Sequence, residues 1–346
     1  MNKLLLKWYQ DNKRDLPWRK TKEPYKIWVS EIILQQTQIK TGLNYYNKFI
    51  HEFPTVKKLA KAQTERVLKI WEGLGYYNRA LNMLESAKLV VKKYNGIFPK
   101  EYDELIKLKG VGPYTAAAIS SFCNKEKKAV VDGNVYRVLS RLYNVETNIN
   151  TTTGKKEFQQ IANKLISQNH PGEYNQAIMD FGATHCTKYH PKCKNCPFQK
   201  KCMSFKLGNV HLRPVKIVKK ISKIRYFNYL FITNKLAFLI QQRSGRDIWK
   251  KLYELPLIET DKKIDKLGLI NQKKLKYLEI INIKKNYDQE HHLSHQKLKI
   301  TFWEINVKSL IINDNIKKIK QEHINKYPFP KPLEKYLKIQ FTNAKK

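Results

Sequence analysis

Four of the five cysteines in this 346-residue chain lie in one short stretch, "FGATHCTKYHPKCKNCPFQKKCM" at residues 181–203, with the spacing C-x6-C-x2-C-x5-C. Clustered thiols form disulfides in oxidising compartments and bind metals in reducing ones, and we expect a cytosolic protein. Only Cys193 and Cys196 have the CxxC spacing of a zinc knuckle, whereas the wider gaps to Cys186 and Cys202 suit a larger cluster. We therefore predict a [4Fe-4S] cluster on these four cysteines, with zinc as the alternative.

The charge of the chain points to a polyanionic partner. Lysine and arginine number 67 against 29 acidic residues, for a formal net charge of +38. A field of this sign attracts the phosphates of nucleic acids, whose bound counterions are released on binding. Base composition of the genome could account for part of the lysine excess. Nucleic acid is still the first partner to expect.

A glycine-rich turn precedes a helical pattern in "LKGVGPYTAAAI" at residues 108–119. Gly110, Val111 and Gly112 lead into Pro113 at the expected first position of the helix. Successive backbone N–H groups at a helix start can bind a DNA phosphate. A single GxG turn is weak evidence, because any short helix connection can use one.

An aspartate opens the next amphipathic stretch, "VVDGNVYRVLSR", in which Val135, Val138, Leu139 and Leu142 share one face. Asp132 suits the N-cap of this helix, and capping alone would explain it. A helix N-terminus also lowers a carboxyl pKa, which would keep Asp132 ionised and able to face a developing cation.

These residues lie in a predicted two-domain protein. Apolar residues recur at helical spacing from residue 1 to 205, with no convincing strand. We divide this helical domain into a six-helix module at about 26–130 and a cluster module formed by 1–25 plus 131–205. A basic linker at 206–222 follows. From 223 to 340 the period changes to two, as in "RYFNYLFITNKLAFLIQQR", which predicts a smaller α+β domain with a hairpin around Thr233-Asn234-Lys235.

The glycine turn, the "VDGNVYRVLSRL" stretch and the cysteine spacing together resemble the helix-hairpin-helix DNA glycosylases. Within that superfamily, "SEIILQQTQI" (30–39) and "GLGYYNRA" (73–80) resemble the adenine glycosylases of the MutY family. The resemblance implies a mainly α helix-hairpin-helix glycosylase domain with an iron–sulfur subdomain, and removal of adenine mispaired with 8-oxoguanine or guanine.

Two carboxyl groups would then share the chemistry, as in glycoside hydrolases. Glu31 follows Ile27 and Trp28 and precedes Leu34 on an expected helix, so desolvation should raise its pKa, unless the side chain simply points to solvent. By resemblance Glu31 protonates N7 of adenine and later activates water. Asp132 would stabilise the oxocarbenium ion or trap it covalently.

Other matched positions would support this reaction. By resemblance Asn134 lies near the sugar or the acid, with helix capping as the alternative. Tyr114 stands where relatives resembling endonuclease III have a nucleophilic lysine, which implies a monofunctional glycosylase. The resemblance places Gln36 and Tyr76 as intercalating and wedging residues, and Arg19 and Gln176 as contacts of the flipped adenine.

The C-terminal part, from "QQRSGRDIWKKLYELP" at 241–256, resembles a Nudix-like domain. It lacks the glutamate-rich helix that holds magnesium in Nudix hydrolases, so we expect it to bind and not to hydrolyse. Leu293, Ser294 and His295 match a Phe-Ser-His loop of the family that senses 8-oxoguanine, with leucine in place of phenylalanine.

Taken together, the sequence predicts a monomeric cytoplasmic enzyme, associated with the nucleoid if bacterial, that acts on double-stranded DNA with A:8-oxoguanine or A:G mispairs and has no membrane partner. One alternative is a bifunctional pyrimidine glycosylase and lyase resembling endonuclease III, against which Tyr114 and the extra domain argue. Another is a non-catalytic DNA-binding protein, against which Glu31 and Asp132 argue.

Overall fold

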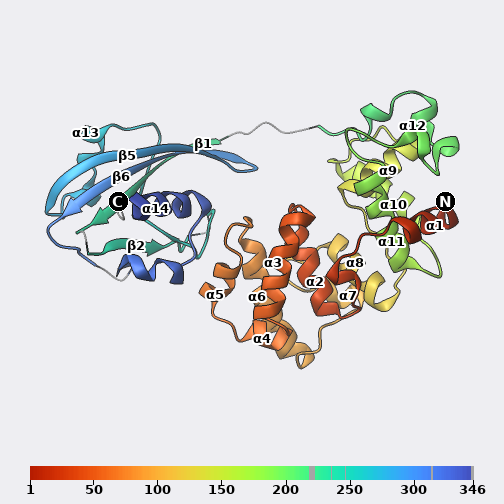
Figure 1. Cartoon of the computed structure of the whole chain (residues 1–346), viewed down its shortest axis with the longest axis horizontal. Coiled ribbons are helices and arrows are strands. Elements are labelled where there is room, and N and C mark those ends of the chain that lie inside the picture. Colours follow the sequence, from red (N-terminus) through yellow and green to blue (C-terminus); the bar gives the residue numbers. More distant parts are fainter. Residues whose placement is uncertain (218–222, 235, 246, 313–314, 344–346) are drawn as a thin grey trace. The chain divides into compact units, whose positions relative to one another are not determined.

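The computed structural model describes residues 1–217, 223–234, 236–245, 247–312 and 315–343. The chain divides into two compact units, one of Met1–Lys61 with Asn82–Val218 and one of Ala62–Leu81 with Lys219–Lys346. Residues 218–222 of the expected linker and Lys235 of the expected hairpin lie outside the described residues. Figure 1 labels helices and strands of both units.

Residues 1–217 contain helices and, as expected, no strand among them. The α-helices are α1 (Asn2–Asn12), α2 (Pro24–Leu34), α3 (Ile39–Glu52), α4 (Val56–Ala60), α5 (Thr64–Ile70), α6 (Asn78–Tyr94), α7 (Tyr102–Leu105), α8 (Pro113–Asn124), α9 (Gly133–Tyr143), α10 (Thr152–Leu165), α11 (Pro171–Asp180) and α12 (Met203–Lys206). Short 3-10 turns η1 (Pro17–Arg19), η3 (Cys193–Asn195), η4 (Gln199–Lys201) and η5 (Val210–Leu212) and the π-helical turn η2 (Phe181–His185) connect them.

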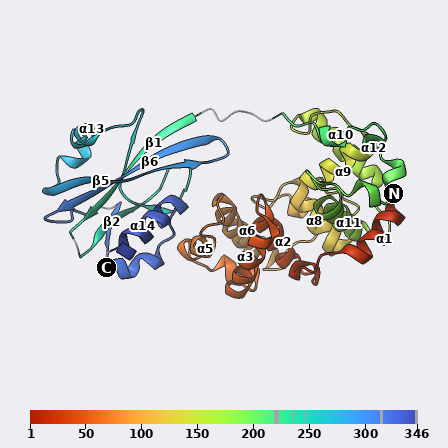
Figure 2. The same cartoon turned by 45° about the horizontal axis from the view of Figure 1, so that its top comes forward.

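One apolar core joins the first helix to helices far along the chain. Leu5 and Tyr9 of α1 pack in the same cluster as Ala177 and Ile178 of α11 and the apolar face of α9. That face comprises the residues predicted from the sequence, Val135, Val138, Leu139 and Leu142. The packing holds α1 beside α11, as both views show (Figures 1 and 2).

The C-terminal part is built on a seven-stranded sheet. Its strands are β1 (Lys223–Thr233), β2 (Phe238–Gln242), β3 (Tyr253–Glu254), β4 (Leu257–Thr260), β5 (Ile280–His292), β6 (Gln296–Val307) and β7 (Ile316–Ile319). The order is β3-β2-β1-β6-β5, with β4 paired to β1 and β7 paired to β2. The expected β1–β2 hairpin is confirmed by the antiparallel pairing of Thr233 with Phe238, whereas β1 and β6 run parallel.

Alternate side chains of β1 enter two separate cores. Phe227, Tyr229 and Phe231 face a core that includes Leu333 and Leu337 of α14 (Lys331–Asn343). Leu230 and Ile232 face the opposite core, which includes Leu269 of α13 (Lys266–Ile270) and Leu275 of η6 (Lys273–Leu275). A further 3-10 segment, η7 (Gln321–Lys326), precedes α14. The predicted α+β domain is therefore a mixed sheet with helices on both faces.

Among the described residues, no helix has both the length and the apolar character needed to cross a membrane.

Candidate active site

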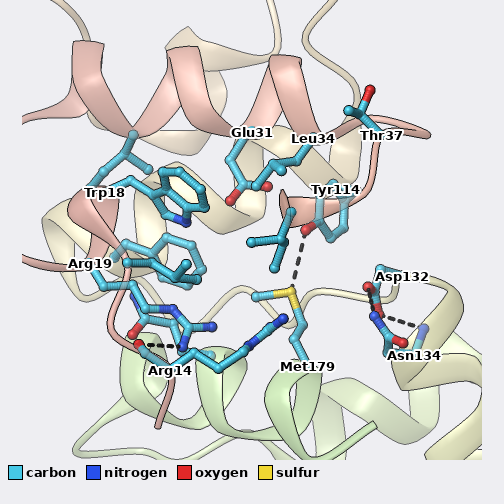
Figure 3. A pocket seen from close by; sticks show the side chains of 15 residues that line it. Arg14, Trp18, Arg19, Glu31, Leu34, Thr37, Tyr114, Asp132, Asn134 and Met179 are labelled. Atoms are coloured by element: carbon cyan, nitrogen blue, oxygen red, sulfur yellow. Dashed lines mark hydrogen bonds between the residues drawn. The ribbon is translucent and has the colours of Figure 1, made fainter. Parts of the chain in front are cut away.

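A cavity of about 180 Å³ lies in the helical unit, where α2, α8, α11, η1 and the start of α9 meet (Figure 3). This size suits a ligand much smaller than the occupants of typical pockets of roughly 300–1,000 Å³. Six of the predicted site residues line it: Arg19, Glu31, Tyr114, Asp132, Asn134 and Gln176. The carboxyl groups of Glu31 and Asp132, which are distant in sequence, therefore face one cavity.

Glu31 projects from α2, a helix whose residues are buried on nearly all sides, and only 7% of its own surface is exposed. Burial raises the pKa of Glu31 to about 7, and the negative charge of Asp132 acts in the same direction. The Tyr114 hydroxyl and the Arg19 guanidinium oppose this shift. A carboxyl group in this state can hold a proton near neutral pH, as the apolar neighbours of Glu31 in the sequence predicted.

Asp132 is the N-cap of α9 and has a very different environment. Its Oδ1 accepts the backbone N–H of Asn134 (2.9 Å) and of Val135 (2.8 Å), and its Oδ2 accepts from Asn134 Nδ2 (2.8 Å). The predicted direction of its pKa shift is wrong. Burial raises the pKa of Asp132, against these hydrogen bonds and the charge of Arg137, because the cavity walls desolvate the carboxylate. The three donors are what favours its anionic form.

Asn134 is more than a first-turn residue. Its Oδ1 accepts from Arg137 Nη2 (2.8 Å), and Arg137 Nε donates to the carbonyl oxygen of Cys186 (2.8 Å). The turn η2 packs so closely here that a Cβ on Gly182 would lie 2.7 Å from Asn134 Cβ. The amide that contacts Asp132 is therefore held between α9 and the segment that leads to the first cysteine.

Three residues outside the sequence predictions, Tyr9, Arg14 and Asp180, organise the opposite wall of the cavity. Arg14 and Arg19 both line the cavity and both bind the carboxylate of Asp180, at the end of α11. The Tyr9 hydroxyl donates to Gln176 Oε1 (2.8 Å), so the amide nitrogen is the group that Gln176 can offer to a ligand. No pattern marked Arg14, Asp180 or Tyr9, because each acts on a partner more than 160 residues away.

Tyr114 lies in the first turn of α8, and its hydroxyl donates to Met179 Sδ of α11 (3.3 Å). Burial raises its pKa well above the usual range, and the charges of Glu31 and Asp132 add to the effect. The phenol is therefore neutral beside both carboxyl groups, where it can donate a hydrogen bond.

Gln36 and Tyr76, predicted to enter the DNA stack, are not among the residues that line the cavity. Both have left-handed backbone conformations, with φ of 57° and 48°. Gln36 is exposed just beyond α2. Tyr76 is 50% exposed in a tight loop, in which Trp71 Nε1 donates to the carbonyl of Gly75 (3.1 Å). A strained backbone that carries an exposed side chain is typical of functional loops.

The glycine turn expected from the sequence is present between α7 and α8. Gly110 has a φ of 79°, Val111 is buried, and Gly112 is the N-cap of α8 with Pro113 following. The buried valine anchors the turn, which leads directly into the twelve-residue helix α8.

The four clustered cysteines follow η2 on loops and 3-10 turns. Within the described part of the chain, no group of three or more His, Cys, Asp or Glu side chains is arranged to bind a metal ion. The chemistry of the thiols nevertheless fits a shared group. The pKa of Cys196 is raised to about 11, first by burial and then by the thiols of Cys186, Cys202 and Cys193. Arg141 is buried beside them and donates to Cys186 Sγ (3.4 Å), so it can balance thiolate charge.

In the C-terminal unit, Leu293, Ser294 and His295 form the short connection between β5 and β6. The Leu293 side chain packs against the core below α14, while Ser294 and His295 are exposed, with Ser294 Oγ 3.3 Å from His295 Nδ1. The leucine therefore anchors the turn, and the two polar residues are the ones presented to solvent.

Comparison with known proteins agrees with this architecture. Residues 29–168 match the HhH-GPD superfamily of base excision DNA repair proteins, and residues 228–338 match the NUDIX domain. An adenine DNA glycosylase of Buchnera aphidicola subsp. Baizongia pistaciae is 38% identical over 319 residues, which cover 91% of this chain and 89% of that protein. The chain belongs to the adenine DNA glycosylase family. It is thus a base-excision-repair enzyme that hydrolyses the N-glycosyl bond of adenine.

Further relatives support the same placement. The human adenine DNA glycosylase is 42% identical over 207 residues, which cover 57% of this chain and 38% of the human protein. Among solved structures, a thermostable thymine-DNA glycosylase is 30% identical with a TM-score of 0.55, covering 59% of this chain and 94% of that one. A DNA complex of endonuclease III, 23% identical with a TM-score of 0.51 and coverage of 59% and 92%, shares the fold.

Proposed function

We propose that this adenine glycosylase acts on adenine mispaired with 8-oxoguanine or guanine in duplex DNA, and that it releases the base without cutting the strand. The observation that carries the proposal is that Glu31 and Asp132 face one small cavity in unlike surroundings. One carboxyl is desolvated and the other accepts three hydrogen bonds.

The reaction needs a proton on the leaving base and an anion beside the sugar. Protonated Glu31 gives its proton to N7 of adenine, the bond between N9 and C1′ breaks, and the base leaves with the bond's electrons. Anionic Asp132 stabilises the positive charge that develops on the sugar. Glu31, now a carboxylate, accepts a proton from the water that adds to C1′.

The remaining lining residues suit recognition of a flipped adenine. The amide nitrogen of Gln176 and the guanidinium of Arg19 offer donors to the ring nitrogens of the base. Gln36 would fill the gap that the base leaves in the stack, and Tyr76 would wedge the duplex. Both side chains are exposed, which this role requires.

Tyr114 supports base release without strand cleavage. Its buried, neutral hydroxyl lies beside Glu31 and Asp132, and a phenol cannot form the Schiff base through which a lysine cuts the strand. We therefore infer a monofunctional glycosylase.

DNA binding would draw on both units. The turn of Gly110, Val111 and Gly112 would bind a backbone phosphate, and the net charge of +38 would attract the duplex. In the C-terminal unit, Ser294 and His295 would contact the base opposite adenine, with Leu293 anchoring the turn. We infer that the enzyme works as a monomer in the cytoplasm, on the nucleoid in a bacterium.

Cys186, Cys193, Cys196 and Cys202 would hold a [4Fe-4S] cluster, which when bound cross-links the loops that follow η2. Lysines between these cysteines, including Lys192, Lys194 and Lys200, are then fixed as a cationic surface for phosphates. Arg141 and Arg137 connect the same loops to α9 through their hydrogen bonds.

Single-turnover cleavage of defined duplexes tests the proposal. Duplexes that differ only in the base opposite adenine are incubated with excess enzyme, and strand breaks are scored before and after hot alkali. We expect breaks only after alkali, fastest opposite 8-oxoguanine and guanine. Glu31→Gln should release base roughly 10²- to 10⁴-fold more slowly. Equal rates opposite every base would overturn the specificity, and breaks without alkali would overturn the monofunctional assignment.

A further inference from the structure

Asp180 is the most heavily hydrogen-bonded carboxylate near the cavity. Its side chain is completely buried at the end of α11. Arg14 binds it through the backbone N–H (3.2 Å to Oδ2), through Nε (2.8 Å to Oδ1) and through Nη2. Arg19 binds it through Nη2 (2.6 Å to Oδ1) and through Nη1 to Oδ2. Each oxygen therefore has contacts from both arginines.

The two arginines, and not Asp180, reach the cavity. Arg14 and Arg19 line the same space as Glu31, whereas Asp180 is absent from its lining. In the view of Figure 3, Arg14 and Arg19 lie below Trp18 and to the left of Met179. The Arg19 guanidinium also lies over the ring of Tyr9, with 5.8 Å from Cζ to the ring centroid. Asp180 can thus act on a ligand only through the arginines it holds.

Charge balance explains why a carboxylate is needed at this position. Two guanidinium groups side by side repel one another, and Arg19 is also largely removed from water, with 11% of its side chain exposed. Asp180 remains ionised: burial raises its pKa, but the hydrogen bonds from Arg19 and Arg14 outweigh this and lower it below the usual range. The trio carries one net positive charge instead of two.

We propose that Asp180 is a positioning residue that fixes Arg14 and Arg19 as a paired set of hydrogen-bond donors for the adenine ring, and that sets the net charge of this wall. The proposal rests on the adenine-binding role given above to the cavity. It assigns no contact with the base to Asp180 itself.

The charge of the trio also acts on Glu31. The groups that face Glu31 are Tyr114 from α8, Asp132 from the start of α9, and Arg19 with Arg14 beyond it. Arg19 lowers the pKa of Glu31. If Asp180 becomes neutral while both arginines remain, more positive charge is left uncompensated, and the carboxylate form of Glu31 is favoured at a lower pH.

Asp180→Asn tests this with single-turnover base release measured across pH, on whichever adenine duplex the wild-type enzyme cleaves. We expect a rate about 10²-fold lower, as a displaced positioning group can cause, with a much smaller change in duplex affinity. We also expect the loss of activity at high pH to begin at a lower pH than in the wild-type enzyme. Glu173→Gln, an exposed acid on the same helix, is the matched control and should behave as wild type.

Two further variants separate positioning from folding. Asp180→Glu keeps the charge but shifts the hydrogen bonds. The rate should therefore fall, while the pH at which activity is lost should stay the same as in the wild-type enzyme. Arg14→Met combined with Asp180→Asn returns the net charge of the trio to +1. The pH at which this double variant loses activity should therefore return toward that of the wild-type enzyme. Thermal unfolding of each variant identifies those that fold.

Several outcomes would overturn the proposal. One is that Asp180→Asn folds and matches Glu173→Gln both in rate and in the pH at which activity is lost. Another is that the double variant loses activity at the same shifted pH as Asp180→Asn. A set in which no Asp180 variant folds also counts against it, because Asp180 would then serve the fold alone. Failure of the proposed mispair specificity is a separate result, seen in the wild-type enzyme before any variant is compared.

Discussion

The two sides of the cavity treat the same functional group in opposite ways. On α2, Glu31 is surrounded by buried apolar residues, and its pKa is raised to about 7. At the start of α9, Asp132 is also desolvated, but three hydrogen-bond donors are directed at its oxygens. A carboxyl without such donors is suited to carry a proton, and one with them is suited to remain an anion. The difference lies in the backbone N–H groups that a helix start provides and a helix middle does not.

The largest effect should come from removing the anion. Asp132→Asn keeps the shape of the side chain but takes away the charge that faces the sugar cation. We expect base release to slow by roughly 10³-fold or more, which is the rate loss typical when an enzyme loses a preorganised electrostatic partner of the transition state. Duplex affinity should change little. Gel-shift titration and single-turnover assays measure the two quantities, and an unchanged rate would remove Asp132 from the mechanism.

Glu31 should cost the enzyme stability at high pH. Its folded-state pKa of about 7 lies above the ordinary value of 4.5, so the folded state binds the proton more tightly. This stability is fully present below pH 4.5 and is lost as the pH rises through 7. Glu31→Gln should therefore stabilise the protein by roughly 3 kcal/mol well above pH 7 and hardly at all near pH 4.5. Thermal unfolding at both pH values measures this, and an equal gain at both would mean that the effect is not protonation.

Arg137 supports Asp132 indirectly, through its hydrogen bond to Asn134, so replacing Arg137 should slow base release. Arg137→Met removes the donor that holds Asn134 Oδ1 and the bond to the carbonyl of Cys186. Loss of such a supporting contact typically slows a site about 10- to 100-fold. Lys164→Met, an exposed charge removal on α10, is the matched control. Equal rates in the two variants would show that Asn134 needs no support.

The smallest effect should come from Tyr9→Phe on the arginine wall. Without the hydroxyl, Gln176 Oε1 loses its hydrogen-bond donor, and the side-chain amide can flip so that its oxygen and nitrogen exchange places. A neutral hydrogen bond contributes about 1 kcal/mol, so we expect a loss of a few-fold in the rate of adenine release. Purine keeps the ring nitrogens to which the Gln176 amide donates, so a duplex with purine in place of adenine should show the same few-fold loss. A loss confined to one of the two bases would contradict this role for Tyr9.

The sequence predicted those parts of the site that are carried by local patterns. The helix of Glu31 and the cap of Asp132 each follow from residues within one or two turns. The parallel pairing of β1 with β6 does not, since it joins segments about 70 residues apart. The same limit hid Asp180 and Tyr9, whose partners lie at the other end of the helical unit.

The direction of the Asp132 shift was mispredicted for a related reason. Hydrogen bonds at a helix start can be read from "VVDGN", but desolvation depends on the walls that α8 and α11 place around the carboxylate. Local sequence therefore identified the donors, and only the tertiary structure identified the burial that opposes them.

The pH dependence of base release by the wild-type enzyme and by Glu31→Gln tests the central claim most directly. Single-turnover rates should fall about tenfold per pH unit above a pKa near 7 in the wild type, because the proton on Glu31 is lost. In Glu31→Gln the remaining slow rate should not show this limb. A limb that persists unchanged in Glu31→Gln, or that is absent from the wild type between pH 5 and about 9, would contradict the account.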